Sequence, residues 1–206
     1  MKSGLRIQSG DFKNRVIPLP KRHHQHQNAT PSRIKESVFQ LVRNELQNES
    51  DFEFFDLFAG SGQMGIEALS LGAYRVCFSE IDPHRLTQIR MTCNDLEIPA
   101  DQVTLTKSKG LKIFQESFGV TESLQIFFAD PPYTYHHKPS NDPALLIQSF
   151  LALSHEVPVH NVYLIIQAHE KNQILSDDFA QTIPEMKRYA YGSNHLVTLR
   201  SQRTNS

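Results

Sequence analysis

The stretch FFDLFAGSGQMGIEALSLGA, residues 54–73, decides the fold of this chain. Its first part belongs to an apolar run that predicts a strand over 52–58, and its last part predicts a helix over 63–72. Between them, Gly60, Gly62 and Gly65 have the spacing G-x-G-x-x-G in the strand–turn–helix order of a nucleotide-binding loop. The same spacing is also compatible with a tight turn that binds no ligand.

Apolar strands and helices alternate after this stretch. Strands are predicted over 73–80, 102–106, 124–129 and 161–168, and helices over 84–97, 110–118 and 143–153. Two further strands, 186–192 and 195–201, flank Ser193-Asn194 and predict an antiparallel hairpin at the edge. The pattern therefore predicts an α/β protein with a Rossmann-like, mostly parallel seven-stranded sheet and helices on both faces.

The N-terminal part has a different pattern. Two short strands within 5–20 flank a Gly10-Asp11 turn, and a polar loop follows over 20–29. A helix then runs to Leu46, for which we predict Thr30 as the N-cap and Pro31 as the first helical residue. The expected organisation is an N-terminal arm and first helix over 1–50, a main domain over 51–201 and a disordered tail over 202–206.

Two acidic residues lie where a cofactor would meet the glycine loop. Asp56 ends the first strand of the main domain, and Glu80 ends the second, 20 positions after Gly60. Glu80 is suited to ribose hydroxyls, whereas Asp56 would repel the pyrophosphate of a dinucleotide. A carboxylate there suits the ammonium group of S-adenosylmethionine, so we expect this cofactor rather than NAD.

A second motif follows the strand 124–129, where Asp130-Pro131-Pro132-Tyr133 forms a stiff corner. The prolines lack amide hydrogens and fix their own backbone angles, and Pro131 keeps Asp130 out of the helical region. A carboxylate and an aromatic ring on such a corner are suited to a flat molecule that donates hydrogen bonds. The alternative is a tight loop with a polar cap and no ligand.

Charge is distributed unevenly along the 206 residues. The whole chain carries a formal charge of −1, but residues 1–43 hold nine Lys or Arg against Asp11 and Glu36, and so carry +7. A basic arm on an acidic body is typical of nucleic-acid binding, although a solvated terminus has the same composition. We name Arg6, Lys13, Arg15, Arg33 and Lys35 as the candidate phosphate contacts.

The remaining composition indicates a cytoplasmic protein. No apolar run is long enough to span a membrane, and the first ten residues lack the apolar stretch of a secretory signal. Cys77 and Cys93 are predicted to be reduced thiols. The histidines at 23, 24, 26, 136 and 137 lack the spacing of a metal site, so we predict no metal.

Several segments in order carry a resemblance to a known family. These are LRIQSGDFKNRVIPLP, TPSRIKESVFQLV, FFDLFAGSGQMGIEALSLGA, DPPY and RYAYGSNHLVTL, which together span about residues 4–200. The chain resembles the bacterial small-subunit ribosomal RNA guanine-N2 methyltransferases, within the class I methyltransferases. The resemblance implies S-adenosylmethionine as methyl donor, S-adenosylhomocysteine as product, and ribosomal RNA as partner, in free form or within an assembling small subunit. We also expect a monomer that does not bind membranes.

The motifs assign candidate roles. The cofactor-binding candidates are Asp56, Phe58, Ala59, Gly60, Gly62, Glu80, Ile81, Lys109 and Asp130, and the catalytic candidates are Asp130, Pro131, Pro132 and Tyr133. Lys109 departs from the family, which usually has an acidic or amide residue there, and Asn28 stands where the family has an arginine. We expect Asp130 and a proline carbonyl to accept hydrogens from a guanine amine, and Tyr133 to stack on the base.

Two other functions remain open at this point. A DNA adenine-N6 methyltransferase also uses DPPY, but it usually carries a separate target-recognition segment, for which the chain has no room. A non-catalytic RNA-binding assembly factor could retain the cofactor pocket without turnover.

Overall fold

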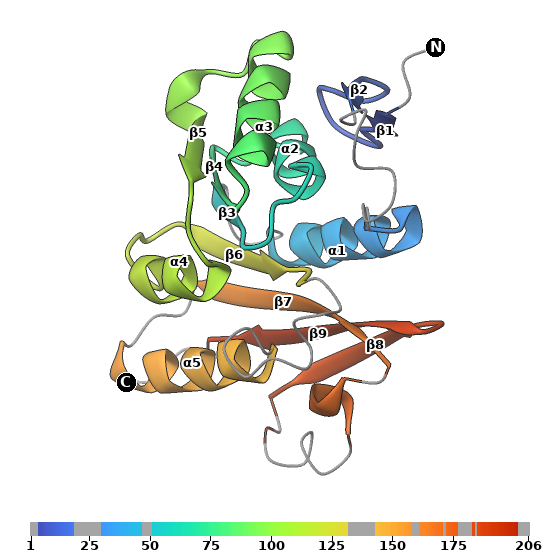
Figure 1. Ribbon diagram of the computed structural model, residues 1–206. Helices are drawn as coiled ribbons and strands as arrows, with labels where there is room; N and C mark the ends of the chain where they lie inside the picture. Colours follow the sequence, from blue (N-terminus) through green and yellow to red (C-terminus); the bar gives the residue numbers. More distant parts are fainter. Residues whose placement is uncertain are drawn as a thin grey trace.

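In a computed structural model, the chain forms one seven-stranded sheet with helices on both faces and a small separate hairpin (Figure 1). The structure describes residues 4–18, 30–46, 51–131, 143–157, 161–170, 172–176, 183 and 185–201. Catalytic candidates Pro132 and Tyr133, the histidines at 23, 24, 26, 136 and 137, and the tail 202–206 lie outside these residues.

The main sheet has the strand order β5-β4-β3-β6-β7-β9-β8. Its strands are β3 (Phe52–Asp56), β4 (Arg75–Ser79), β5 (Val103–Thr106), β6 (Leu124–Ala129), β7 (Val162–His169), β8 (Lys187–Tyr191) and β9 (Asn194–Arg200). The first five are parallel, and β9 is antiparallel to both β7 and β8. The predicted Rossmann-like fold is therefore confirmed, including its antiparallel edge.

Within the described residues, five α-helices accompany the sheet: α1 (Ser32–Glu45), α2 (Gln63–Ser70), α3 (Pro83–Asp95), α4 (Gly110–Ser117) and α5 (Pro143–Glu156). Short 3-10 turns, η2 (Ala100–Gln102) and η5 (Gln173–Leu175), complete the described elements of the main domain. None of the helices in the described part of the chain is long and apolar enough to cross a bilayer.

The alternation of side chains along β3 separates two hydrophobic cores. Phe54 packs in the core under α1, α2 and α3, whereas its neighbour Phe55 packs in the core under α4 and α5. Rings continue across β6, where Phe128 lies 6.3 Å from Phe54 and Phe127 lies 4.4 Å from Phe55, between ring centroids. The period of two thus explains why every residue of β3 is buried.

Some boundaries differ from prediction. The strand predicted over 52–58 ends at Asp56, because Leu57 and Phe58 already belong to the turn that leads to α2. The hairpin turn consists of Gly192 and Ser193, not Ser193 and Asn194: Gly192 adopts a φ of 66°, and Asn194 already pairs with Tyr191. The helix predicted to start with a Thr30 cap begins at Ser32 with Pro31 as its N-cap residue.

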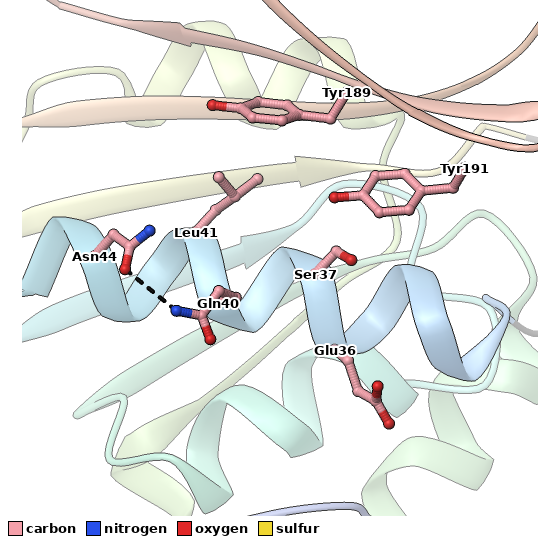
Figure 2. Close-up of a pocket in the computed structure, with 7 residues that line it drawn as sticks. All are labelled: Glu36, Ser37, Gln40, Leu41, Asn44, Tyr189 and Tyr191. Carbon is pink, nitrogen blue, oxygen red and sulfur yellow. Dashed lines mark hydrogen bonds between the residues drawn. The ribbon is translucent and has the colours of Figure 1, made fainter.

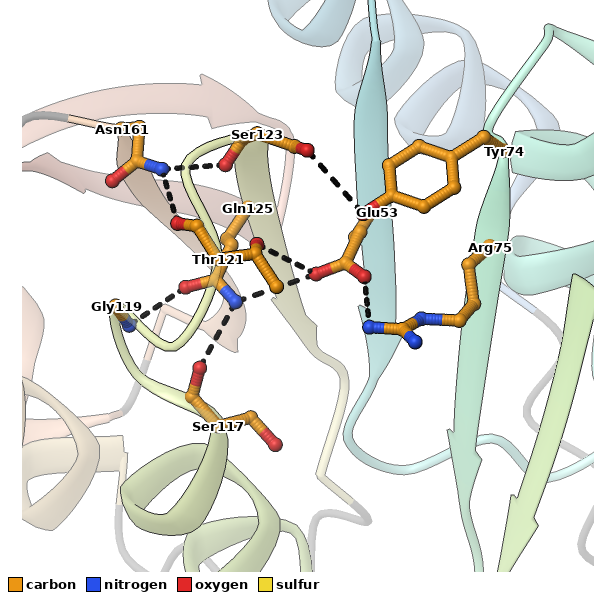
Figure 3. A network of polar contacts seen from close by, with 9 residues as sticks. All are labelled: Glu53, Tyr74, Arg75, Ser117, Gly119, Thr121, Ser123, Gln125 and Asn161. Carbon is orange, nitrogen blue, oxygen red and sulfur yellow. Dashed lines mark hydrogen bonds and ion pairs between the residues drawn. The ribbon is translucent and has the colours of Figure 1, made fainter.

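A polar network closes the sheet at the amino ends of β3 and β6 (Figure 3). The buried carboxylate of Glu53 pairs with Arg75 and accepts hydrogen bonds from Thr121 Oγ1 at 3.0 Å and Gln125 Nε2 at 3.4 Å. These contacts join β3 to its neighbours at one end of the strands. Asp56 lies at the opposite end of β3, so the network is separate from the candidate site.

The N-terminal hairpin, β1 (Gly4–Arg6) with β2 (Val16–Pro18), lies apart from the main sheet (Figure 1) and is attached to α2 by hydrogen bonds. Glu67 of α2 accepts from the amide of Gln8 at 2.7 Å, and Ser70 Oγ accepts from the amide of Phe12 at 2.9 Å. Ile7 and Ile17 belong to the same core as α1 and α2. The arm is thus fixed directly to the helix that follows the glycine loop.

Lys35 is the centre of this attachment, and its predicted role in phosphate binding is wrong. The side chain is 1% exposed, and its Nζ lies 2.5 Å from Glu67 Oε1 and 3.2 Å from the carbonyl oxygen of Arg6. Helical periodicity places Lys35 between Ile34 and Val38 on the inner face of α1. Its ammonium group therefore joins α1 to α2 and β1 and is not available to a phosphate.

We predict that Lys35→Met lowers the free energy of unfolding by roughly 3 to 5 kcal/mol, because Glu67 then stays buried without its cation. Urea denaturation monitored by circular dichroism measures the change. Lys112→Met, at a lysine of α4 whose side chain is 66% exposed, is the matched control and should have little effect. A Lys35→Met protein as stable as the control would contradict this account of the attachment.

Candidate functional site

The carboxyl ends of β3, β4 and β6 bring three predicted acidic residues to one edge of the sheet. Asp56 ends β3, Glu80 follows β4, and Asp130 follows β6, which pairs directly with β3. In α/β sheets of this kind, ligands bind outside the carboxyl ends of the strands. The sequence-predicted acids are therefore assembled where the fold places ligands.

The glycine loop has the backbone geometry that its residues predict. Gly62 has a φ of 77°, and a Cβ there would lie 2.8 Å from Ile89 of α3. Gly65 lies against the ring of Phe78, which a Cβ would approach to 2.2 Å. Side chains at these two positions would push α2 and α3 off the sheet, so the glycines allow the tight turn between Asp56 and α2.

Asp56 is the most strongly perturbed of these acids. It is 1% exposed, and burial raises its pKa to about 7, helped by the negative charges of Asp130 and Glu80. The amide of Gly65, 3.3 Å from Oδ2, acts in the opposite direction. Among the described residues, no lysine, arginine or histidine forms an ion pair with Asp56.

The Glu80 carboxylate is held by two backbone amides, one from the glycine loop and one from the residues that follow Glu80. Its Oε2 accepts from the amide of Gly60 at 2.9 Å, and its Oε1 accepts from the amide of Asp82 at 3.0 Å. Arg85 Nη1 lies 3.5 Å from the same Oε2. Each carboxylate oxygen retains a lone pair, so the orientation of Glu80 suits the hydroxyls of a ribose.

Ile81 follows Glu80, and its side chain is 51% exposed at this edge. Phe58 is half-buried and Ala59 is buried in the turn between β3 and α2. Lys109 is exposed at the start of α4, where its carbonyl accepts from the amides of Lys112 and Ile113. Its predicted contact with a cofactor stays a prediction.

Asp130 is half-buried at the end of β6, and Pro131 after it is buried. Burial raises the pKa of Asp130 to about 6, while a hydrogen bond from Thr30 lowers it. Thr30 Oγ1 donates to Asp130 Oδ2 at 2.8 Å across 100 positions of sequence. Because no local pattern links positions this far apart, the sequence suggested only a helix cap for Thr30.

The five basic residues predicted to bind phosphates differ in their exposure to solvent. Arg6, Lys13, Arg15 and Arg33 are exposed, whereas Lys35 is buried. Arg6 donates to the carbonyl of Asn14 and Arg15 to that of Asp95, each at 3.1 Å, so both keep further donors available to solvent. The four exposed side chains remain the predicted phosphate contacts.

A groove of about 390 Å³ lies elsewhere, between α1 and the edge strand β8 (Figure 2). It is lined by Glu36, Ser37, Gln40, Leu41, Asn44, Tyr189 and Tyr191. None of these residues belongs to the predicted site, and none of the three acids at the strand ends lines the groove. Among the described residues, no group of three metal-ligating side chains occurs.

A family model described as "Conserved hypothetical protein 95" matches residues 5–200. The chain belongs to this family. Together with the relative described next, this match confirms the resemblance to the small-subunit ribosomal RNA methyltransferases. Ribosomal RNA small subunit methyltransferase D of Haemophilus influenzae is 27% identical over 135 residues, which cover 66% of this chain and 67% of that protein.

Solved structures confirm the class I methyltransferase fold of this family member. The Escherichia coli protein yhhF, a proposed methyltransferase, has a TM-score of 0.69 at 17% identity and covers 97% of this chain and 99% of its own. A proposed methyltransferase of Streptococcus mutans, solved in complex with SAH, has a TM-score of 0.54 at 16% identity. The match covers 79% of this chain and 96% of that protein.

We predict that Asp56→Asn changes stability in a pH-dependent way. The pKa of Asp56 is about 7 in the folded state and about 4 in the unfolded chain, so between these pH values the unfolded chain has lost the proton that the folded state still holds, and the stability of wild type falls as pH rises. The amide cannot ionise. Between pH 5 and pH 8 the variant should therefore gain on the order of 2 kcal/mol relative to wild type.

Urea denaturation of both proteins without ligand, at pH 5 and pH 8, measures this difference. A stability difference that stays constant over this range would show that Asp56 does not carry a buried, unpaired charge.

Proposed function

We propose that this protein transfers a methyl group from S-adenosylmethionine to the exocyclic N2 amine of a guanine in small-subunit ribosomal RNA. One observation supports this most: Asp56 and Asp130 lie at the carboxyl ends of the adjacent strands β3 and β6, and neither has a cation among the described residues. A buried acid without a cation is suited to a positively charged ligand.

The residues present fit that cofactor. Asp56 would bind its ammonium group, the oriented Glu80 its ribose hydroxyls, and the exposed Ile81 side chain the face of its adenine. Bound S-adenosylmethionine would supply an electrophilic methyl group. The relative from Streptococcus mutans, solved with SAH, supports the same ligand class for the fold.

Asp130 and the prolines would act on the nucleophile. The lone pair of a guanine amine is conjugated with the ring, so the amine is a poor nucleophile until its hydrogens are directed to acceptors. Asp130 accepts a hydrogen bond from one N–H of the amine, and a proline carbonyl accepts a hydrogen bond from the other. The two bonds hold the nitrogen in line with the methyl group of the donor and favour its rehybridisation. The proton lost after transfer is very acidic, so Asp130 does not need to be a strong base.

Ribosomal RNA as the substrate rests on the family and on the relative named as a small-subunit ribosomal RNA methyltransferase. The exposed basic residues of the arm and of α1 add a surface that suits phosphates. We further propose that the protein acts as a monomer in the cytoplasm, on RNA that is free or within an assembling subunit.

A tritium-methyl transfer assay tests the reaction. The protein is incubated with labelled donor and, in parallel, with free small-subunit RNA, assembled subunits and naked DNA, and the labelled nucleoside is identified. Label in N2-methylguanosine is expected. Label in adenine would replace this function by the DNA enzyme, and binding without any transfer would favour an assembly factor.

Within this assay, Asp130→Ala should lower turnover by roughly 100-fold or more, because the amine loses its acceptor. Calorimetry should show donor binding close to that of wild type. An Asp130→Ala protein that retains most of its turnover would remove Asp130 from the chemistry.

Salt dependence tests the basic surface. Arg33→Gln should lower the slope of log K against log salt for RNA binding by about 0.7, the value for one lost phosphate contact on a single strand. Lys112→Gln, an exposed lysine on the opposite face of the sheet, is the control. Equal slopes for Arg33→Gln and wild type would exclude Arg33 from the RNA contact.

A further inference from the structure

Thr30 contacts the proposed catalytic acid from a distant part of the chain. Its hydroxyl donates to Asp130 Oδ2 at 2.8 Å, and both side chains are half-buried. The hydroxyl is not used to cap α1, which begins two residues later with no side-chain cap. Since Thr30 does not cap the helix, its hydrogen bond to the Asp130 carboxylate indicates a different role for the hydroxyl.

The position of this hydroxyl is set by the docking of α1. Pro31 follows Thr30 with φ −55° and ψ 142°, and its carbonyl accepts from the amide of Lys35 at 3.0 Å. The side chain of Lys35 is buried against Glu67 of α2. Thr30 therefore precedes a helix whose first turn is joined to α2, the helix that follows the glycine loop.

The contact has two consequences for Asp130. Thr30 donates to one carboxylate oxygen, Oδ2, and so fixes the orientation in which Oδ1 can accept a hydrogen bond from a substrate amine. A donated hydrogen bond also favours the ionised carboxylate, against the burial that raises its pKa. Both effects serve a group that must accept a hydrogen bond near neutral pH.

We propose that Thr30 is a positioning residue, which orients the Asp130 carboxylate and keeps it ionised for the substrate amine. This role rests on the proposed function for its effect on turnover, but its effect on Asp130 itself does not depend on any substrate. The hydroxyl is the group that matters, so serine should replace threonine and valine should not.

The charged groups on the elements around Asp130 are the same in every variant. Among the described residues they are Asp56 at the end of β3, Glu80 after β4 with its partner Arg85 on α3, and, on α1, the exposed Arg33 and the Lys35 that pairs with Glu67. None of them is changed in the test below, so a shift between variants reports on the hydroxyl.

The experiment compares Thr30→Val, Thr30→Ser and wild type, with Thr104→Val on an exposed position of β5 as the matched control. Thr30→Val should lower kcat by about 10-fold to 100-fold, with donor affinity unchanged. The acidic limb of the pH profile should move to higher pH, because a carboxylate without its donor protonates more readily. Thr30→Ser should recover most of both changes.

A substrate-free measurement separates this proposal from the proposed function. Carbon-13 NMR of the Asp130 carboxyl carbon, titrated in each protein, should show a pKa higher by about half a unit to one unit in Thr30→Val than in wild type or Thr30→Ser. If wild type transfers no methyl group but this shift is seen, the proposed function fails and the contact stands. An unshifted Asp130 titration, or a loss of kcat that Thr30→Ser shows in full, overturns the role of Thr30.

Discussion

Burial of the Asp56 carboxyl group is the constraint on which the rest of the site depends. Asp56 lies at the end of a strand that is buried along its whole length, and this burial raises its pKa to about 7. The amide of Gly65 partly compensates, and it can do so because the glycine loop turns tightly between β3 and α2. What remains is a negative site that a cation would complete.

The loop therefore has a structural and a chemical role at once. Its glycines allow α2 to approach Phe78 and α3 to approach the loop, and the same approach places Asp56 and Glu80 at one edge. Asp130 reaches this edge because β6 pairs with β3. Parallel pairing thus places the acid suited to a cationic cofactor beside the acid suited to an amine.

The N-terminal segment is part of this arrangement through α1. A buried ion pair between Lys35 and Glu67 holds α1 and the hairpin against α2, and the residue at the start of α1 touches Asp130. The exposed basic residues of the arm are carried by the same elements. The N-terminal segment that carries the exposed basic residues therefore also contacts the Asp130 carboxylate.

Sequence reasoning predicted the sheet and its edge well, because apolar strands such as 124–129 and the glycine spacing at 60–65 are local signals. It failed where partners are distant. Charge counting could not distinguish the buried Lys35 from the exposed Arg33, since only packing against Glu67 separates them. Thr30 met the local rule for a helix cap, yet its hydroxyl serves a carboxylate on another strand.

Proton release on cofactor binding tests the central claim most directly. Calorimetric titration with S-adenosylmethionine at pH 7, in buffers of different ionisation enthalpy, counts the protons displaced once the ligand's own titration is subtracted. A cation bound at Asp56 should lower the pKa of that group and release about half a proton for each ligand bound. Binding that releases no protons in wild type, or releases the same number in Asp56→Asn, would contradict the account.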